Sequence, residues 1–270
     1  MAKAQYVGVG NVARKVKQPY VGVSNVARKV KNGCVGVGGV ARQFFTGGIP
    51  ASELTVGSSV YLMESGAAVE YMVVNQGIPS GSSLYDSSCN GTWLLRKDVY
   101  GTKVQWHTSA VNAYGSSNVH TYLNNTYLNL FDSNTKSLIK QVKIPYANGK
   151  STTTIYSGTN GLSTKIFLLS GYELGLTKNN FTSRLSVDGA LLDYFVEANG
   201  STLRATPSNN GYFMRSVNTG MTSGESVYFI SSGTSGGASS TQPTSSYYVR
   251  PALILPSKAL FDSTTLILQS

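Results

Sequence analysis

Charged side chains are scarce in this sequence, and long apolar runs are missing. Asp, Glu, Lys and Arg make up 13% of the 270 residues, about half of the roughly 25% usual for soluble domains. This scarcity excludes a coiled coil, while a hydrophobic content of 41% excludes a disordered chain. No apolar run approaches the roughly 20 residues needed to cross a bilayer, and the first residues have no signal-peptide core. We therefore expect a soluble, mostly β or α+β protein that does not insert into a membrane.

Cysteine and histidine are almost absent, which limits the metal and redox chemistry available. Cys34 and Cys89 are too few for a disulfide framework and form no Cys-x-x-Cys pair, so we expect two free thiols. His107 and His120 stand 13 residues apart, which is not a helical metal-ligand spacing. No Glu-Pro-Asn or Trp-Asn-Asp run supplies oxygen ligands for calcium. The sequence predicts no metal site and no cofactor.

No catalytic pattern emerges from the remaining polar residues. A nucleophile at Cys89 would need a nearby base, and His120, one of the two histidines, fits a structural role beside an apolar helix stripe. Gly8–Ala13 matches a dinucleotide fingerprint, but it belongs to a short β repeat that no helix follows. A wall-associated hydrolase remains a lesser alternative because four carboxylates fall in one stretch. They are Glu173, Asp188, Asp193 and Glu197. We predict that the protein is not an enzyme.

The first 48 residues contain a 14-residue unit three times, beginning at Tyr6, Tyr20 and Cys34. Each unit is typical of a β-hairpin: a strand, a two-residue turn such as Gly10-Asn11, and a second strand. Pairing across this turn places Val9 opposite Val12, and Val7 opposite Arg14 on the same face. We expect residues 1–48 to form a basic β-repeat arm and residues 49–270 a separate domain. Connecting turns are expected at Gln18-Pro19 and Asn32-Gly33.

The arm carries the excess positive charge. It holds 8 of the 22 basic residues and no acidic residue, whereas residues 49–270 hold 14 against 12. Because an isolated hairpin is only marginally stable, we expect the arm to associate with copies of itself or with a larger assembly. An arginine on an apolar face needs a carboxylate or carbonyl partner. Nucleic acid is a less suitable partner because aromatic interleaving and a recognition helix are missing. The expected anchoring residues are Arg14, Arg28, Arg42, Lys15 and Lys29.

The rest of the chain reads as antiparallel strands with two or three short helices. Paired strands over 56–63 and 69–75 should meet at a Ser65-Gly66 turn, and a helix over 117–131 should begin behind a serine cap. Ser170 and Glu173 have capping-box spacing, which predicts a short helix there. Further strands are expected at 93–97, 165–169, 212–216, 226–231 and 248–255, a second helix at 135–142, and a long polar loop at 232–246.

Five ordered motifs resemble an uncharacterised domain common in gut bacteria and in their phages and prophages. They are Trp106 followed by Tyr122-Leu-Asn124, Phe167-Leu-Leu-Ser-x-x-Glu173, Tyr212-x-Met-Arg-Ser216 and Val249-Arg-Pro-Ala-Leu253. The Val-Gly-Val repeat is similar to arms that precede this domain in phage proteins. The ending also resembles the C-type-lectin-like fold of variable phage receptor-binding proteins. These resemblances imply a lectin-like α+β body with a virion or surface role.

The resemblance also implies a displayed face built from the loops at 208–211, 217–225 and 232–248. Its expected ligand-binding residues are Asn209, Asn210, Tyr212, Asn218, Thr234, Tyr247 and Tyr248. For Arg215 and Arg250 the structural interpretation is favoured, an arginine fork that ties the last strands to backbone carbonyls or to Glu173. Trp93 and Trp106 are expected to be structural.

These observations predict a phage virion structural protein that is assembled in the host cytoplasm. Its arm would bind other virion proteins, in a homo-oligomer for which we favour a trimer, and its body would bind a host-surface glycan or protein. The alternative is a head or tail decoration protein with a purely structural role. In that case the loop at 232–248 would be buried against neighbouring subunits instead of projecting into solvent.

Overall fold

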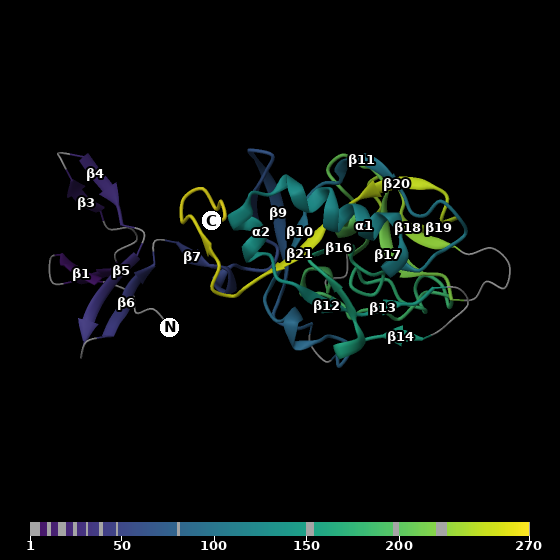
Figure 1. The fold of residues 1–270 in the computed structure, drawn as a ribbon, viewed down its shortest axis with the longest axis horizontal. Coiled ribbons are helices and arrows are strands. Elements are labelled where there is room, and N and C mark those ends of the chain that lie inside the picture. The colour runs from purple at the N-terminus through teal and green to yellow at the C-terminus, as the bar shows by residue number, and fades with distance from the viewer. Residues whose placement is uncertain are drawn as a thin grey trace.

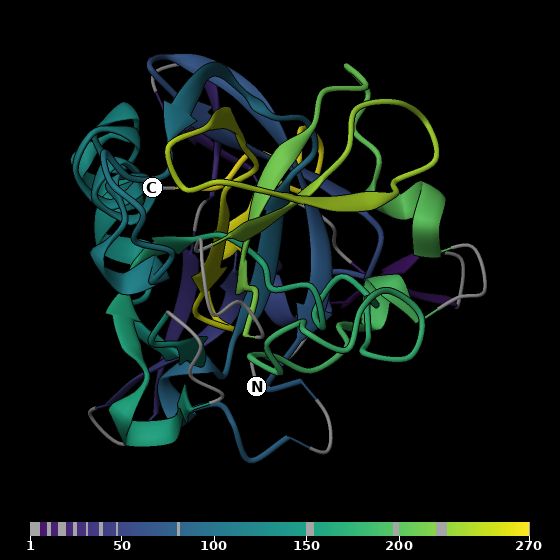
Figure 2. The ribbon, with the colours of Figure 1, turned by 90° about the vertical axis from the view of Figure 1, so that its right-hand side faces the viewer.

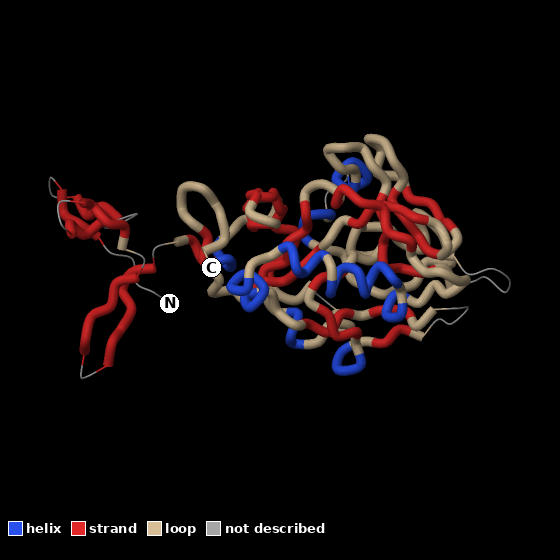
Figure 3. The backbone as a smooth tube through the Cα atoms, turned by 45° about the horizontal axis from the view of Figure 1, so that its top comes forward, coloured by secondary structure: helices blue, strands red, loops and turns tan. Residues whose placement is uncertain are grey.

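Strands and loops make up most of the protein, and its helices are short (Figure 3). The computed structural model describes residues 6–9, 12–15, 20–23, 26–30, 32–37, 40–46, 48–79, 82–149, 154–196, 200–219 and 226–269. The α-helices are α1 (Asn118–Asn125), α2 (Ser133–Leu138) and α3 (Gly200–Arg204). Single 3₁₀ turns lie at Ala51–Glu53, Ser87–Cys89, Tyr114–Ser116, Tyr127–Leu130, Gly158–Asn160 and Asp193–Phe195. The chain is a mostly β protein with antiparallel sheets and few helices, which agrees with the predicted class in these coarse terms.

One five-stranded sheet lies in the middle of the body and is antiparallel throughout. Its strands, in spatial order, are β16 (Ile166–Phe167), β21 (Ala252–Leu255), β10 (Thr92–Arg96), β9 (Ala67–Gln76) and β8 (Ser59–Glu64). The predicted turn between β8 and β9 is confirmed: Ser65 and Gly66 have φ angles of 47° and 84°. A two-residue turn whose twist matches that of the flanking strands requires positive φ at both residues.

A second five-stranded sheet lies towards one end of the body. Its strands, in spatial order, are β11 (Tyr100–Gln105), β20 (Ser246–Val249), β17 (Tyr212–Val217), β18 (Val227–Ile230) and β19 (Ala238–Thr241). The pair of β17 and β20 is parallel and the other pairs are antiparallel. Three two-stranded pairs complete the body: β12 (Val142–Ile144) with β15 (Leu162–Thr164), β13 (Tyr146–Ala147) with β14 (Ile155–Tyr156), and β7 (Ile49–Pro50) with β22 (Leu260–Phe261).

The predicted strand over 248–255 is wrong as a single element. The chain breaks at Arg250 and Pro251, so that β20 belongs to the second sheet and β21 to the first. Proline has no N–H to donate to a ladder, which explains why the strand is interrupted here. This corner therefore joins the two sheets covalently.

The predicted loop over 232–246 is also only partly a loop. Residues Ala238–Thr241 form β19, which pairs in antiparallel register with β18. An uncharged Ser/Thr strand has no apolar alternation to reveal it, and it is held by its ladder with β18. What remains of the predicted loop is residues 232–237 and the turn at 242–245 before β20.

The predicted helix caps are present. Ser117 accepts a hydrogen bond from the His120 N–H before α1, and α1 buries Val119 and Leu123. Ser170 and Glu173 form the reciprocal capping-box bonds at 2.9 and 3.1 Å, but they close a single turn instead of a helix. The second helix lies at Ser133–Leu138. It begins two residues earlier than predicted, because Asp132 caps it, and ends four residues earlier.

The arm forms the three predicted hairpins. They are β1 (Tyr6–Val9) with β2 (Val12–Lys15), β3 (Tyr20–Val23) with β4 (Val26–Lys29), and β5 (Asn32–Val37) with β6 (Val40–Thr46). The register confirms Val9 opposite Val12 and Val7 opposite Arg14. The expected turn at Asn32-Gly33 is wrong, since both residues lie in β5 beside a register shift. Residues 10–11 and 18–19 lie outside the described residues, and so does the stretch 220–225 of the predicted loop.

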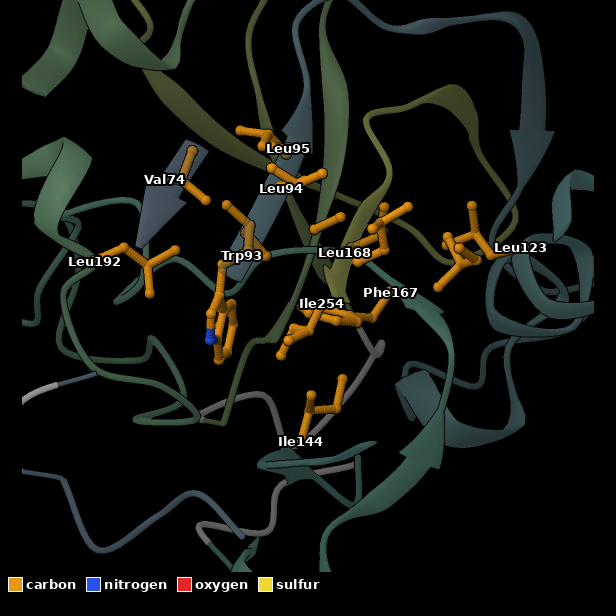
Figure 4. Packing of buried hydrophobic residues seen from close by; sticks show 14 of the residues in the cluster. Val74, Trp93, Leu94, Leu95, Leu123, Ile144, Phe167, Leu168, Leu192 and Ile254 are labelled. Carbon is orange, nitrogen blue, oxygen red and sulfur yellow. The ribbon is translucent and has the colours of Figure 1, made fainter. Parts of the chain in front are cut away.

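Trp93 marks the centre of the hydrophobic core. Its ring meets Tyr85 and Phe167 edge-on, with centroids 5.5 and 5.6 Å apart. Figure 4 shows it with Phe167, Ile254 and Ile144 on one side, and Ile254 is its partner across the β10–β21 ladder. The Trp93 indole N–H donates to the carbonyl oxygens of two residues outside the ladder. Trp93 is therefore packed and hydrogen bonded within the core.

The arm enters the body beside the C-terminal strand. Ile49 and Pro50 form β7, which pairs with β22. Figure 1 shows β18 and β19 at the other end of the body from β7. Within the described residues, none of the helices has both the length and the apolar content to span a membrane.

Candidate functional site

The end of the body farthest from β7 carries segments 206–210 and 231–241, which belong to the regions that the sequence predicts to be displayed. Figure 2 views the molecule from this end, with the second sheet in front and the arm behind it. We call the exposed residues of segments 206–210 and 231–241 the loop surface. They are Pro207, Ser208, Asn209, Ser232, Thr234, Ser235, Ser239 and Ser240.

The loop surface offers hydroxyl and amide groups and hardly any charge. No charged residue occurs between Ser226 and Val249. Such groups both donate and accept hydrogen bonds, and they carry no charge that would attract an ionic ligand. The chemistry of this surface suits polar, uncharged groups such as sugar hydroxyls or peptide amides.

Hydrogen bonds fix the backbone of segment 206–210. The Asn209 N–H donates to the Thr206 carbonyl at 2.9 Å, and the Asn209 carbonyl accepts the Gly233 N–H at 2.8 Å. Asn209 has a φ of 55°, a left-handed conformation that asparagine tolerates better than most residues. Ser208 donates to the Asp98 carboxylate at 2.6 Å. The exposed side chain of Asn209 is therefore presented from a braced turn.

Arg204, at the end of α3, connects the loop surface to the interior. Its side chain is buried and donates from Nε to the Gly236 carbonyl at 2.9 Å and from Nη1 to the Leu174 carbonyl at 3.1 Å. Burial lowers the pKa of Arg204 from its ordinary value. The guanidinium thereby holds segment 231–237 against the core.

Arg250 also supports the backbone next to the loop surface, from the interior of the body. Its guanidinium donates to the carbonyls of Arg96 and Lys97, each at 2.9 Å, and to the carbonyl of Arg204 at 3.2 Å. The Tyr212 hydroxyl lies 3.2 Å from Nη1 and donates to the Arg204 carbonyl at 2.8 Å. Arg250 is 2% exposed, so it is a fork to backbone carbonyls and has no free donor face for a ligand.

The predicted ligand-binding residues divide into two groups. Asn209 and Thr234 are exposed, and Asn210, Tyr247 and Tyr248 are half-buried. Tyr212 and Asn218 are buried, at 3% and 7% exposure, so their assignment to the displayed face is corrected. Tyr212 lies in the central strand β17, and Asn218 directly follows that strand, where its N–H donates to the Ser226 carbonyl. The Tyr212 hydroxyl donates to the Arg204 carbonyl, and the Arg250 guanidinium lies 5.4 Å from the Tyr212 ring centroid, which accounts for the burial of Tyr212.

The two tyrosines before the corner lie in different surroundings. Tyr247 packs against Phe229 and Phe213, with ring centroids 4.1 and 5.3 Å away. Tyr248 lies beneath the Lys103 ammonium, whose Nζ is 5.3 Å from the ring centroid. Each tyrosine is thus already engaged within the chain, and each retains only part of its area for a ligand.

A fully buried ion cluster is centred on Arg215, a residue of β17. Arg215 makes a bidentate pair with Glu173, at 2.6 and 2.5 Å. It also donates to the carbonyls of Pro145, Leu168 and Asp188 at 2.7 to 2.9 Å. Burial by itself would lower the pKa of Arg215, but the Glu173 carboxylate raises it above its ordinary value. These are the two kinds of partner, a carboxylate and backbone carbonyls, that the sequence indicates for this arginine.

Two hydroxyl groups complete the cluster. The Tyr85 hydroxyl donates to Glu173 at 2.7 Å, and the Ser216 hydroxyl donates to Asp188 at 2.6 Å. Every one of these groups is buried. Because no solvent reaches the carboxylates, the cluster has the character of a structural network, unlike the open carboxylate pair of a glycosidase.

Asp188 should make the stability of the protein depend on pH. Burial raises the pKa of Asp188 to about 6, although Arg215 acts in the opposite direction. Between roughly pH 4 and 6 the folded state binds a proton that the unfolded state has released, so this group lowers the free energy of unfolding as pH rises. The loss is about 1.4 kcal/mol for each unit of the pKa shift.

The variant Asp188→Asn should remove this pH dependence. It keeps an acceptor for Ser216 and has no charge to bury, so we expect it to be more stable than the wild type at pH 7 and similar near pH 4. Urea unfolding at both values measures the difference. A variant that is less stable than the wild type at pH 7 would contradict this assignment of the charge.

The remaining chemically distinctive side chains are also buried. Trp106 is fully buried against Tyr114 and Phe213, as expected for a structural residue. Burial lowers the pKa of His120 and raises the pKa of the Cys89 thiol to about 11, which leaves little thiolate for nucleophilic chemistry. Among the described residues, His, Cys, Asp and Glu side chains form no group of three or more that could hold a metal ion.

Sequence reasoning missed Arg204 and the contact between Ser208 and Asp98. Arg204 is the last residue of a five-residue helix, and nothing in its neighbourhood distinguishes it from a solvated arginine. Asp98 lies 110 residues before Ser208, a separation that no local pattern spans. The short turn at Ser208-Asn209-Asn210 was the available signal, because asparagine in a turn favours positive φ.

Comparison with known protein families gives a match over more than half of the chain. The model of a family described as a domain of unknown function, DUF6273, matches residues 90–257. The match runs from β10 to β21 and includes Arg204, Arg215, Arg250 and the loop surface. No curated protein and no solved structure matches the chain.

Proposed function

Because the chain belongs to the DUF6273 family, a family of unknown function, we propose its role from its own geometry: a phage virion protein that displays a lectin-like domain for binding the host surface. The arm anchors the chain to other virion proteins, and the loop surface binds a glycan or protein on the host cell. The proposal involves no catalytic step. It rests on the resemblance of the motifs and on the geometry of the loop surface.

The observation that carries the proposal is the bracing of an exposed, uncharged surface. Arg204 and Arg250 are buried arginines whose donors go to the backbone of the loops and strand ends beneath that surface. A loop surface held in one geometry loses less conformational entropy on binding, which favours recognition. A solvated linker would need no such support.

The direction of display supports the same role. The arm joins the body at β7, and the loop surface lies at the opposite end (Figure 1). A protein fixed at its arm would hold this surface away from its anchoring point. This arrangement fits a displayed binding domain.

Substitutions on the loop surface test the proposal. The variant Thr234→Ala/Ser235→Ala should lower binding of the full chain to cell-envelope fragments of gut bacteria by at least tenfold, because it removes two exposed hydroxyls. The thermal midpoint should stay unchanged, since both residues are exposed. Ser263→Ala/Thr264→Ala is the matched control, because these exposed residues lie beside β22, near the arm.

Equal binding by both variants and the wild type would contradict receptor binding. If particles carrying the loop variant also remained fully infectious, the decoration role would replace it. The two roles are separated because a decoration protein needs incorporation into the particle and no envelope ligand.

The arm should be required for incorporation. We expect Arg14→Ala/Arg28→Ala/Arg42→Ala to abolish co-purification with phage particles while the body keeps its thermal midpoint. The reason is that each of these arginines occupies the same register position in its hairpin, opposite a valine. Particle purification followed by immunoblotting measures the outcome, and normal incorporation would contradict anchoring by these residues.

A further inference from the structure

The three arm hairpins each have two faces, and only one of them is the same in every unit. Pairs two positions apart in the register share a face. The first face carries three valines and an arginine in all three units: Val7, Val9, Val12 and Arg14; Val21, Val23, Val26 and Arg28; Val35, Val37, Val40 and Arg42. We call it the Val/Arg face.

The opposite face varies between units. Tyr6 and Tyr20 are replaced by Cys34 in the third unit, and Lys15 and Lys29 are replaced by Gln43. Tyr20, on this face, is 63% exposed. A repeat that keeps one face and changes the other is constrained by what touches the constant face.

Hydrogen bonding between the arm strands does not cover the Val/Arg face. Among the described strands, each arm strand is hydrogen bonded only to its own hairpin partner. An isolated two-stranded hairpin is only marginally stable, and an arginine among valines needs an acceptor once it is covered.

Charge indicates the nature of the missing partner. Residues 1–48 hold eight basic residues and no acidic one, so two arms brought together would repel and would supply no carboxylate. Carboxylates match the planar guanidinium with two parallel hydrogen bonds. The charge balance therefore favours an acidic protein surface, different from the arm, as the partner.

We propose that the three Val/Arg faces are equivalent docking units for a repeating protein surface, each placing its arginine against a carboxylate beside an apolar patch. This rests on the proposed anchoring role and names its partner class. Three linked units bind more tightly than one because the second and third contacts form at a high effective concentration.

The test uses the full chain and poly-L-glutamate as a repeating carboxylate probe. Deleting residues 6–19 or 6–33 removes one or two whole units, and we expect affinity to fall about tenfold for each. The variant Arg14→Lys/Arg28→Lys/Arg42→Lys keeps the charge and should weaken binding at least tenfold, since lysine cannot form the bidentate pair. Lys15→Arg/Lys29→Arg, on the variable face, is the matched control and should change binding less than twofold.

Three outcomes would overturn the proposal. Equal binding by the two charge-preserving variants would mean generic electrostatic attraction, and tighter binding to duplex DNA than to poly-L-glutamate would mean a phosphate ligand. Sedimentation showing oligomers that depend on the number of units would mean that arms bind each other. These results do not test envelope binding by the loop surface. The display role is therefore tested independently, by the loop-surface variants.

Discussion

Replacing Arg215 with methionine is expected to destabilise the body by about 3–5 kcal/mol, enough to unfold many domains of this size. Arg215 is fully buried and donates five hydrogen bonds, two to Glu173 and three to backbone carbonyls. Methionine fills a similar volume but donates nothing. The variant would leave a buried carboxylate without its counter-charge and three carbonyls without their donor.

The second variant separates the charge from the packing. Arg215→Met/Glu173→Gln removes the unpaired carboxylate, so we expect it to regain part of the lost stability, in keeping with other buried ion pairs. Lys97→Met is the matched control for an exposed ion pair, because Lys97 lies 2.8 Å from Glu70 with both side chains partly exposed. It should cost at most about 1 kcal/mol.

Urea unfolding followed by tryptophan fluorescence measures all three variants, since Trp93 lies in the core. A loss at Arg215 no larger than the loss at Lys97 would show that the buried pair adds nothing beyond a surface pair. A double variant as unstable as the single one would assign the loss to the carbonyls instead of the charge.

Local rules predicted the local parts of the fold. The Ser65-Gly66 turn, the Ser117 cap and the reciprocal bonds of Ser170 with Glu173 all follow from backbone chemistry within a few residues. The arm register follows equally directly from its two-residue turns. These features need no knowledge of the rest of the chain.

Sheet membership could not be predicted in this way. The apolar run over 248–255 reads as one strand, yet Arg250 and Pro251 divide it between two sheets. Pro251 was the residue that indicated a break. Tyr212 is predicted on the displayed face because it borders a polar loop, but it is buried beside the Arg250 guanidinium, which comes from a distant segment. Which strands flank a given strand is decided by contacts between distant segments.

In the candidate site, too, local features were predictable and contacts between distant segments were not. The exposed polar residues were predictable from composition, because a stretch rich in serine, threonine and glycine has no apolar side chains to bury. The bracing beneath them was predictable only for Arg250, because an arginine inside a predicted apolar strand and next to a proline favours a structural role. Arg204 meets Gly236 across a separation of 32 residues, which no local signal records.

Replacing Arg250 with lysine should loosen the loop surface while leaving the charge intact. Lysine presents its donors from one nitrogen and cannot reach the carbonyls of Arg96, Lys97 and Arg204 together, as the guanidinium does. We expect a loss of about 2–4 kcal/mol from the carbonyls left unsatisfied. Because these carbonyls belong to segments 96–98 and 204–210, hydrogen exchange should rise there first.

Hydrogen exchange also distinguishes positioning from general stability. Amides of the β12–β15 pair, which is not hydrogen bonded to segments 96–98 or 204–210, should remain protected. Binding to envelope fragments should weaken together with the loosening of segment 204–210. Arg184→Lys, at an exposed arginine, is the matched control and should change neither exchange nor binding. A uniform rise in exchange with unchanged binding would mean that Arg250 only adds stability, whereas a rise confined to the two segments, with weaker binding, would make it the residue that positions the displayed surface.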